Sequence, residues 1–461
     1  MNDTIAAIST PTAPAGLGVI RLSGSDALTV AARVFKPVSD ARTPDRLAGY
    51  TAAYGHVADS DGVIDECVLL AFRAPHSYTG EDVAEISCHG GMYVLQRTLR
   101  ACFAAGARPA GAGEFTRRAF LNGKMDLTQA EGVMELIAAN GRLAARTALA
   151  AREGATYRRL QAVKADLLAV AAQMGAYVDY PDDDIPALEP AALAATMESA
   201  RAAIGALLAT FDAGKVLREG VDTAIVGCPN VGKSTLMNCL AGCERSIVTA
   251  VAGTTRDVVE DTVRLGDVVL HLADTAGIRA TDDLVESVGV EKARARLAQA
   301  ALVLAVFDGS RPLTAEDEAL ISLCAGAPAI AVINKADLPQ QADLDFIDFI
   351  SRLARDFFAV VSLSAKEGTG IDALTSAVAH ITGIENLDAS EPVLATERQR
   401  DCATRCLAAL DEAAASLDAG MTLDAVGVNL DDAIAAILEL TGERATEAVV
   451  DEVFARFCVG K

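Results

Sequence analysis

The segment GCPNVGKST, residues 227–235, has the residue types and spacing that point most clearly to chemistry. It fits the pattern GxxxxGK[ST] and lies between a strand-like run and a helix-like run. In this pattern Gly227 and Gly232 let backbone N–H groups approach a phosphate. Lys233 would reach the β- and γ-phosphates of a nucleotide, and the Ser234 hydroxyl would bind Mg²⁺. The segment therefore predicts a nucleoside triphosphate site.

Two later motifs predict which base such a site selects. NKAD, residues 334–337, completes the strand-like run AIAVIN. The Asp337 carboxylate can accept hydrogen bonds from N1–H and the N2 amine of guanine, and adenine offers neither donor in that place. SAK, residues 364–366, fits the loop that backs the guanine O6. Together these motifs predict a guanine nucleotide.

Two segments between these motifs are expected to sense the γ-phosphate. DTAG, residues 274–277, ends the run VVLHLAD; its Asp274 can hold Mg²⁺ through water, and the N–H of its glycine can contact the γ-phosphate. TAVAGTTRD, residues 249–257, lies where a GTPase has its first switch. Thr254 or Thr255 would supply a second hydroxyl to Mg²⁺, and Thr255 is the better candidate. The residues expected to contact GTP are Asn230, Val231, Gly232, Lys233, Ser234, Thr235, Thr249, Ala250, Val251, Ala252, Gly253, Thr254, Thr255, Asp274, Thr275, Ala276, Gly277, Asn334, Lys335, Asp337, Ser364, Ala365 and Lys366.

The position after DTAG departs from a common arrangement. A Gln often stands there and orients the attacking water, whereas this chain has Ile278. Arg256 and Arg279 are both candidates for a catalytic positive charge, and no sequence feature selects one of them. Hydrolysis of GTP would therefore need another water-orienting group and another positive charge.

The order of strand-like and helix-like runs predicts the elements that position these motifs. Residues 217–380 contain the buried-strand candidates DTAIVG, VVLHLAD, ALVLAVFD and AIAVIN. Helical stretches separate most of them, which is typical of a doubly wound, mostly parallel sheet. Residues 121–216 and 381–461 are helical, so the simplest interpretation is one helical domain with an inserted α/β domain. Residues 1–120 predict a small α/β or α+β domain, with a helix opened by Ser25 or Asp26.

Composition limits the classes of function. The net charge of −23 means that the overall field would repel nucleic acid, so any RNA contact needs a local basic surface. The ten Cys residues show no CxxC pair and no zinc pattern. The N-terminal run lacks the features of a signal peptide, and no uninterrupted apolar run reaches the ~18 residues of a membrane helix. These features predict a cytoplasmic, reducing compartment, in which Cys458 would be a free thiol.

The sequence ends on FCVGK, residues 457–461. The amphipathic run before it would hold this tail against a core, and Gly460 would let the chain turn off the helix end. The apolar residues on one face of that run are Val449, Val450, Val453, Phe454 and Phe457. A reactive thiol, Cys458, and a cation, Lys461, would then be fixed in place.

Taken together, these motifs resemble the MnmE (TrmE) family of tRNA modification GTPases, within the TrmE-Era-EngA-like group of P-loop GTPases. The resemblance is carried by the GTTRD switch, by DTAGIR followed by VESVGVEKAR, and by the terminal Cys-x-Gly-Lys. In the N-terminal region RLSG, HSYTGEDVAEISCHGG and GEFTRRAFLNGKMDLTQAE are similar to the family as well. The likeness covers essentially the whole chain.

The resemblance implies a fold, an activity and partners. The fold would be multidomain, α/β plus all-α, with an N-terminal α/β domain for tetrahydrofolate binding and dimerisation and an inserted Ras-like GTPase domain. The activity would be GTP hydrolysis coupled to modification of C5 of the tRNA wobble uridine, with an aminomethyl or carboxymethylaminomethyl group as the product. The partners would be a second copy of the chain, tRNA and the FAD-dependent MnmG, in a heterotetramer or larger complex without a membrane. A folate one-carbon unit, from 5-formyltetrahydrofolate or a related tetrahydrofolate, and ammonium or glycine would be used.

The resemblance also fills the catalytic gap left by Ile278. It implies a K⁺ ion bound by Asn230 and by the switch residues Thr249, Val251 and Thr254. Much of that shell would be main-chain carbonyl. The family's water-orienting acid matches Glu286, which as an isolated residue would be taken for a surface charge.

For the folate, the resemblance implies contacts from Arg21, Glu85, Lys124 and Lys461. Cations suit the glutamyl carboxylates of folate, and a carboxylate suits the donor edge of the pterin. His89 could be an acid–base group, and a structural turn is at least as good an interpretation. Cys458 could act as a nucleophile, a redox group or a positioning residue.

Two other functions fit parts of the sequence. A ribosome-assembly GTPase would share the nucleotide motifs and act as an rRNA-binding switch, but it would need a basic RNA-binding module beside the nucleotide domain. A folate-dependent aminomethyl transferase with a regulatory GTPase domain would differ mainly in which domain carries the chemistry.

Overall fold

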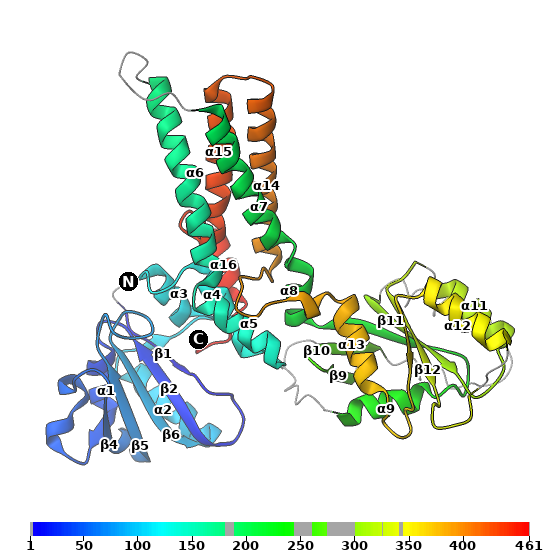
Figure 1. Cartoon of the computed structure of the whole chain (residues 1–461). Helices are drawn as coiled ribbons and strands as arrows, with labels where there is room; N and C mark the ends of the chain where they lie inside the picture. Colours follow the sequence, from blue (N-terminus) through cyan, green and yellow to red (C-terminus); the bar gives the residue numbers. More distant parts are fainter. Residues whose placement is uncertain are drawn as a thin grey trace. The chain divides into compact units, whose positions relative to one another are not determined.

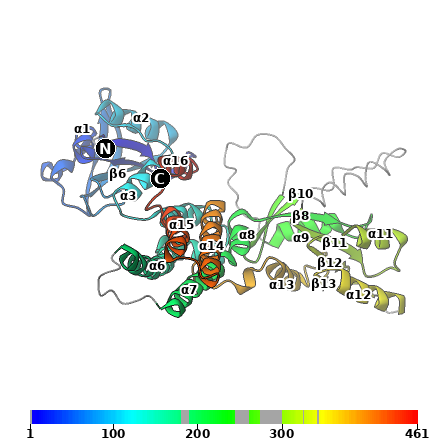
Figure 2. The same cartoon turned by 90° about the horizontal axis from the view of Figure 1, so that it is seen from above.

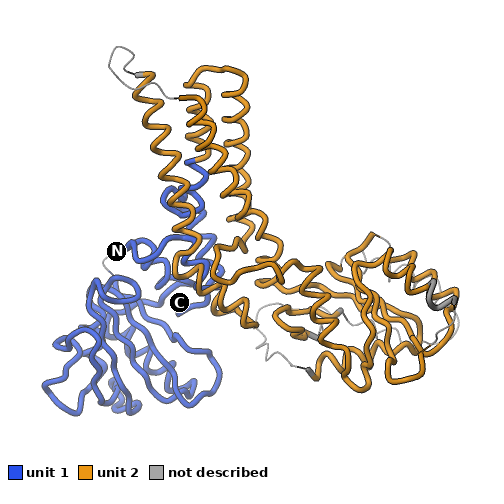
Figure 3. Tube along the Cα trace, viewed as in Figure 1, with its two compact units in different colours: residues 1–134, 434–461 blue, residues 135–433 orange. Residues whose placement is uncertain are grey.

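The computed structural model describes residues 3–179, 189–243, 261–273, 300–324, 326–340 and 344–460. The chain forms two compact units (Figure 3): residues 1–134 with 434–461 make the first, and residues 135–433 make the second. Figure 1 gives the labels of the elements. The boundaries of the four segments expected from the sequence, 1–120, 121–216, 217–380 and 381–461, remain a prediction.

The first unit is built on one sheet with strand order β3-β4-β5-β6-β2-β1-β7. Its strands are β1 (Ile5–Ile8), β2 (Ala15–Ser23), β3 (Phe35–Pro37), β4 (Thr51–Asp59), β5 (Gly62–Phe72), β6 (Val83–Gly90) and β7 (Arg108–Pro109). Neighbours run antiparallel except for the parallel pair β1 and β7.

Two helices, α1 (Ala27–Val34) and α2 (Met92–Ala104), pack on one face of this sheet. Strand residues of one parity, such as Ile20 and Leu22, face that core because side chains alternate along a strand. Asp26 is the N-cap of α1, but its side chain makes no capping hydrogen bond. The sequence therefore located the helix start correctly, although the expected capping bond is absent.

The opposite face of the same sheet has a smaller apolar cluster beneath α3 (Glu114–Leu121). Phe115 of α3 packs there with Ile5 and Ala7 of β1 and with the partly buried Tyr78. Chain segments far apart in the sequence thus meet on this face.

The C-terminal run closes the first unit. Helix α16 (Glu447–Ala455) follows α15 (Leu423–Thr441) and packs against α4 (Leu127–Ala138). The buried residues of the run are Val450, Val453, Phe454 and Phe457, as the amphipathic pattern predicted. Gly460 has a φ of +101°, and a Cβ there would lie 2.4 Å from the carbonyl oxygen of Ile8. The tail is therefore held closely along the end of β1.

The second unit contains a sheet with strand order β13-β12-β11-β8-β10-β9. Its strands are β8 (Val221–Val226), β9 (Asp261–Leu265), β10 (Val268–Ala273), β11 (Leu302–Asp308), β12 (Ala329–Asn334) and β13 (Ala359–Ser362). All neighbouring pairs are parallel except β9 and β10. The predicted doubly wound, mostly parallel sheet is confirmed, and β9 and β13 add to the four expected strands.

Helices cover both faces of this sheet. Residues of α9 (Lys233–Cys243) and α13 (Ile371–Ile381) share one apolar cluster with the strands, and residues of α11 (Ala315–Cys324) and α12 (Leu344–Asp356) share another. Because both faces are buried, the central strands are almost wholly apolar, as their sequences indicated.

The second unit also contains further helices besides the first part of α15. They are α5 (Arg142–Arg152), α6 (Ala155–Asp179), α7 (Pro190–Leu208), α8 (Phe211–Glu219) and α14 (Glu397–Asp418). Helix α7 packs against α6 and α14, and the three run side by side in both views (Figures 1 and 2). Within the described residues one stretch, Pro190–Glu219, is long and apolar enough to cross a membrane, a criterion that core helices of soluble proteins also meet.

Candidate functional site

The loops that carry the nucleotide motifs leave the carboxyl ends of three parallel strands. The 227–235 loop joins β8 to α9, the 334–337 motif begins at the last residue of β12, and the 364–366 motif follows β13. Carboxyl ends of parallel strands lie at one edge of a sheet, where such folds bind ligands. The three motifs therefore come together, as the sequence predicted for a single site.

One buried amide joins all three motifs. Asn334 is 3% exposed. Its Nδ2 donates to the Val231 carbonyl oxygen at 2.9 Å, and its Oδ1 accepts from the Ala365 N–H at 3.0 Å. The side chain thus fixes the spacing between the phosphate loop and the loops expected around the base. The sequence motif indicated Asn334 without revealing this bridging role.

The phosphate loop has the backbone that its glycine pattern predicts. Gly232 has a φ of +100°, and a Cβ at that position would lie 2.3 Å from Nδ2 of Asn334. Only glycine fits there without displacing the bridging amide. Asn230 also has a positive φ, of 63°, a conformation that asparagine tolerates better than most residues.

Lys233 lies over this loop. Its Nζ donates to the carbonyl oxygens of Gly227 at 2.7 Å and Cys228 at 2.9 Å. Burial lowers the pKa of its ammonium group. Ser234 and Thr235 lie in the first turn of α9 and are exposed. A held ammonium group beside an exposed hydroxyl at a helix N-terminus fits a triphosphate and its Mg²⁺.

The residues expected around the base are also ordered by hydrogen bonds. The Ser364 hydroxyl donates to Oδ1 of Asp337 at 2.6 Å, and this bond lowers the pKa of the Asp337 carboxyl. Lys335 forms an ion pair with Asp308 at the end of β11, with 2.6 Å between Nζ and Oδ2. The ionised Asp337 can therefore accept from the two donors of guanine.

Several predicted site residues lie outside the described residues. These are the switch residues Thr249, Ala250, Val251, Ala252, Gly253, Thr254 and Thr255, the motif Asp274, Thr275, Ala276 and Gly277, and Arg256, Ile278, Arg279, Glu286 and Lys461. Their roles stay predictions.

In the first unit, Arg21 and Glu85 form a cross-strand pair. They are directly opposite in the β2–β6 register, and Nε of Arg21 donates to Oε1 of Glu85 at 2.8 Å. The guanidinium carbon lies 5.5 Å from the ring centre of Tyr78 and 5.7 Å from that of Phe115. The arginine is thus ion-paired and in cation–π contact with both rings.

The loop before β6 connects this pair to Lys124. Tyr78 and Gly80 both belong to it, and a Cβ at Gly80 would lie 3.4 Å from Cγ of Lys124. The exposed Nζ of Lys124 donates to the Pro75 carbonyl oxygen at 3.0 Å. The structure therefore places Arg21, Glu85 and Lys124 around one loop.

The C-terminal tail is held in this unit of the same chain. The Cys458 carbonyl oxygen accepts from the Gly113 N–H at 3.4 Å. Val459 pairs with Ala112 in an isolated bridge, and the Ser9 hydroxyl donates to the Gly460 carbonyl oxygen at 3.0 Å. Cys458 is an exposed free thiol beside the start of α3. The predicted anchoring of the tail is confirmed.

His89 stands at the end of β6 with Asp65 as its partner. Its Nδ1 lies 2.8 Å from Oδ1 of Asp65, and this bond raises the pKa of the exposed imidazole. The Asp65 carboxylate also accepts from the backbone N–H of His89 at 2.7 Å. Both the structural and the acid–base interpretation of His89 are compatible with this pair.

The sheet and its three motif loops define the class of the protein: it is a P-loop protein of the guanine-nucleotide-binding type. Family models match almost the whole chain, namely the N-terminus of the GTP-binding protein TrmE over residues 4–124 and the MnmE helical domain over residues 127–458. The tRNA modification GTPase MnmE of Chloroflexus aurantiacus is 44% identical, with 100% of both chains covered. That of Geobacter sulfurreducens is 42% identical, also with 100% of both chains covered. The chain belongs to the MnmE family of tRNA modification GTPases.

Among solved structures, part of the chain is similar to a Tyr-to-Ala variant of Era of Aquifex aeolicus bound to GDP and AlF4⁻. The match covers 41% of this chain and 66% of that chain at 28% identity, with a TM-score of 0.28. The family assignment rests on the sequence matches.

Proposed function

We propose that this protein hydrolyses GTP in a K⁺-dependent cycle that drives modification of C5 of the tRNA wobble uridine. The observation that carries the proposal is the juxtaposition of the phosphate loop with Asn334, Asp337 and Ser364, in a chain of the MnmE family. GTP would be bound by Lys233, Ser234 and the 364–366 loop, with Asp337 selecting guanine. Mg²⁺ would be held by Ser234 and Thr255.

The positive charge missing from the site would come from K⁺. Asn230 is exposed in the phosphate loop with its left-handed backbone, so its side-chain oxygen is available to a cation. Thr249, Val251 and Thr254 would complete the ion's ligands, and Glu286 would orient the attacking water.

The first unit would bind a tetrahydrofolate. Arg21 and Glu85 are ion-paired and would therefore contact the same end of the ligand, and Lys124 supplies a cation for its glutamyl carboxylates. Cys458 is exposed in the tail that contacts Gly113, and Lys461 would join the cations. A homodimer and an FAD-dependent MnmG partner acting in the cytoplasm would complete the enzyme.

The ribosome-assembly alternative gains no specific support. The two family matches together extend over residues 4–458 apart from 125–126, and they include the N-terminal unit that an rRNA-binding switch does not need. We therefore do not propose it.

The K⁺ assignment is tested by GTP hydrolysis in matched KCl and NaCl. We expect faster hydrolysis in K⁺ for the wild-type chain and loss of that difference in Asn230→Ala. Equal rates of the wild-type chain in the two salts would remove K⁺ from the proposal.

The tail is tested with Cys458→Ser. We expect GTP hydrolysis at the wild-type rate and loss of the modified wobble uridine, because the thiol is distant in sequence from the nucleotide motifs and belongs to the other unit. A wild-type nucleoside profile in tRNA from the mutant would instead make Cys458 structural.

A further inference from the structure

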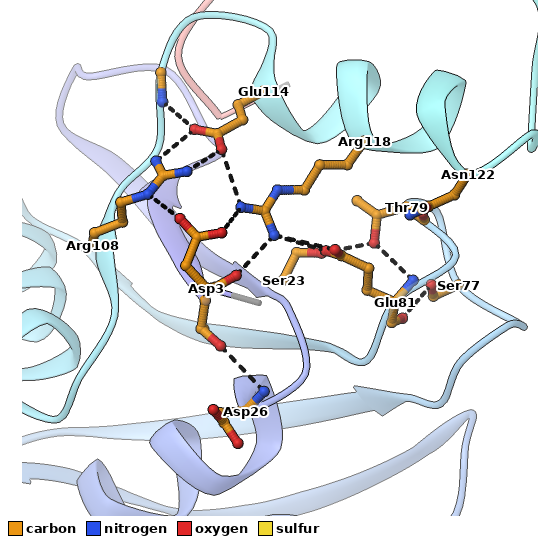
Figure 4. A network of polar contacts seen from close by, with 12 residues as sticks. Asp3, Ser23, Asp26, Ser77, Thr79, Glu81, Arg108, Glu114, Arg118 and Asn122 are labelled. Carbon is orange, nitrogen blue, oxygen red and sulfur yellow. Dashed lines mark hydrogen bonds and ion pairs between the residues drawn. The ribbon is translucent and has the colours of Figure 1, made fainter. Parts of the chain in front are cut away.

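We propose that Tyr78 is a positioning residue that, with Phe115, fixes the guanidinium group of Arg21 so that its free edge faces a carboxylate-bearing ligand. The inference rests on the proposed tetrahydrofolate site and adds to it a residue that does not contact the ligand. It also explains a buried ion-pair network in the same unit (Figure 4).

The geometry at Arg21 leaves one edge of the guanidinium group available. Nε and Nη2 both lie 2.8 Å from Oε1 of Glu85. Among the described residues, Nη1 has no hydrogen-bond acceptor. A guanidinium edge with free N–H groups is well suited to bind a carboxylate. The pair with Glu85 thus orients the cation without using all of its donors.

The two aromatic rings restrict how Arg21 can move. The ring centres of Tyr78 and Phe115 lie 5.5 Å and 5.7 Å from the guanidinium carbon, within the range of cation–π attraction. A long, flexible arginine side chain loses conformational entropy when it binds a ligand. Because the rings and Glu85 already hold the guanidinium group, less of that entropy remains to be lost on binding.

Tyr78 is itself fixed from α3. Its hydroxyl lies 2.9 Å from Oγ1 of Thr116, and Thr116 is fully buried. Phe115 precedes Thr116 on the same helix and is also fully buried. The helix therefore supplies one ring directly and holds the other through a hydrogen bond.

A network around Arg118 joins α3 to the loop that carries Tyr78. Arg118 is 2% exposed. Its Nη1 donates to Oε2 of Glu81 at 3.1 Å and to the Asp3 carbonyl oxygen at 2.9 Å, and its Nη2 donates to Oε1 of Glu114 at 3.1 Å. Glu81 in turn accepts from the Ser23 hydroxyl at 2.8 Å. Figure 4 shows the guanidinium group of Arg118 between Asp3 and Glu81.

Further bonds hold the same loop at Thr79, the residue directly after Tyr78. The Thr79 hydroxyl lies 2.7 Å from that of Ser23, and Nδ2 of Asn122 donates to the Thr79 carbonyl oxygen at 2.7 Å. Asn122 lies two residues before Lys124, which is the second proposed cation of the site. The same bonds therefore fix the backbone from which the Lys124 side chain extends. Arg118 is buried and both of its terminal nitrogens, Nη1 and Nη2, are bonded within the network, so it is unsuited to contact the ligand and serves to fix the loop.

The test is binding of 5-formyltetrahydrofolate to the full-length chain, measured by titration calorimetry. We expect Tyr78→Leu, which lacks the ring, to bind about tenfold more weakly. Tyr78→Phe keeps the ring and should bind within about threefold of wild type. Thr116→Val should match Tyr78→Phe, and the double variant should be no weaker than either, because both changes remove one hydrogen bond.

Binding of GTP and the melting temperature are measured on the same samples to establish that each variant is folded. Wild-type folate affinity in a folded Tyr78→Leu chain would overturn the inference. If the wild-type chain does not bind the probe, the folate proposal fails, and a crystal structure of the Tyr78→Leu chain decides the positioning role. An Arg21 side chain in its original orientation there would overturn that role, and a displaced one would support it.

Discussion

At the scale of single residues, the nucleotide site depends on side chains that bond to the loops as well as on those expected to touch GTP. Asn334 is the clearest case, because one buried amide contacts both the Val231 carbonyl and the Ala365 N–H. Gly232 makes that contact possible, since any side chain there would collide with the amide. The two sequence motifs specify Asn334 and Gly232, because the amide makes both hydrogen bonds and only glycine leaves room for it.

The selectivity for guanine can be tested at Asp337. An Asn at this position presents a donor where the carboxylate accepted from the base. We therefore expect Asp337→Asn to weaken GTP binding by at least about 100-fold and to improve binding of xanthosine triphosphate, whose N1–C2 edge carries an acceptor. Competition with a fluorescent nucleotide measures both. Unchanged preference for GTP over xanthosine triphosphate would place the base elsewhere.

At the scale of elements, helix α5 is capped by a residue from a distant hairpin. Its N-cap is Gly141, which has no side chain to do this. Oδ1 of Asp267, in the turn between β9 and β10, accepts from the Leu143 N–H at 3.0 Å. Nothing in the sequence near α5 predicts this cap, because the acceptor lies 124 positions away.

Removing this cap should loosen the start of α5. Loss of an N-cap acceptor costs about 1 kcal/mol, so we expect Asp267→Ala to speed hydrogen exchange of the Leu143 N–H by about fivefold. Asp432→Ala, which changes an exposed aspartate on α15, is the matched control and should leave α5 unchanged. Equal exchange in Asp267→Ala and wild type would mean that the bond contributes nothing.

The ion-pair network of the first unit makes its stability depend on pH. Burial alone would raise the pKa of Glu114, but hydrogen bonds from Arg108, the Gly111 N–H and Arg118 overcome this and lower the pKa from 4.5 to about 2. A lowered pKa in the folded state means that the ionised carboxylate stabilises the fold above pH 4.5. This stabilisation is lost as the pH falls from 4.5 towards 2.

Glu114→Gln should therefore lower the melting temperature at pH 7 and lessen its fall between pH 5 and pH 3, measured by calorimetry. The shift corresponds to at most about 3 kcal/mol at neutral pH. Glu452→Gln, in an exposed pair with Arg456, should follow the wild type at every pH. A Glu114→Gln curve parallel to wild type would show that Glu114 does not titrate in this window.

Some helices and strands could be predicted from the sequence and others could not. The central strands of the second unit were predictable, because a strand buried on both faces is a continuous apolar run. Helix α16 was predictable as well, because a helix buried on one face has apolar residues at helical spacing. Strands such as β3 and β13 were not, since three or four residues give too short a pattern. The Arg118 network could not be predicted from the sequence for another reason. Asp3 and Arg118 are 115 positions apart and come into contact only in the folded chain.

At the scale of the whole molecule, the chain combines two units that carry different candidate chemistry. The second unit contains the guanine-nucleotide motifs, and the first contains the Arg21–Glu85 pair, Lys124 and the anchored tail with Cys458. The function proposed above would join these two sets of residues in one activity, which neither unit implies alone. In that proposal tRNA modification requires both units, and GTP binding requires only the second.

In the function proposed above, GTP hydrolysis by this chain supports modification of the tRNA wobble uridine. The most direct test of this function is nucleoside analysis of tRNA from a strain that lacks the gene, complemented with the wild-type chain or with Lys233→Ala. We expect the modified uridine to be absent without complementation, restored by the wild-type chain and not restored by Lys233→Ala. A modified uridine in the uncomplemented strain, or full restoration by Lys233→Ala, would contradict the account.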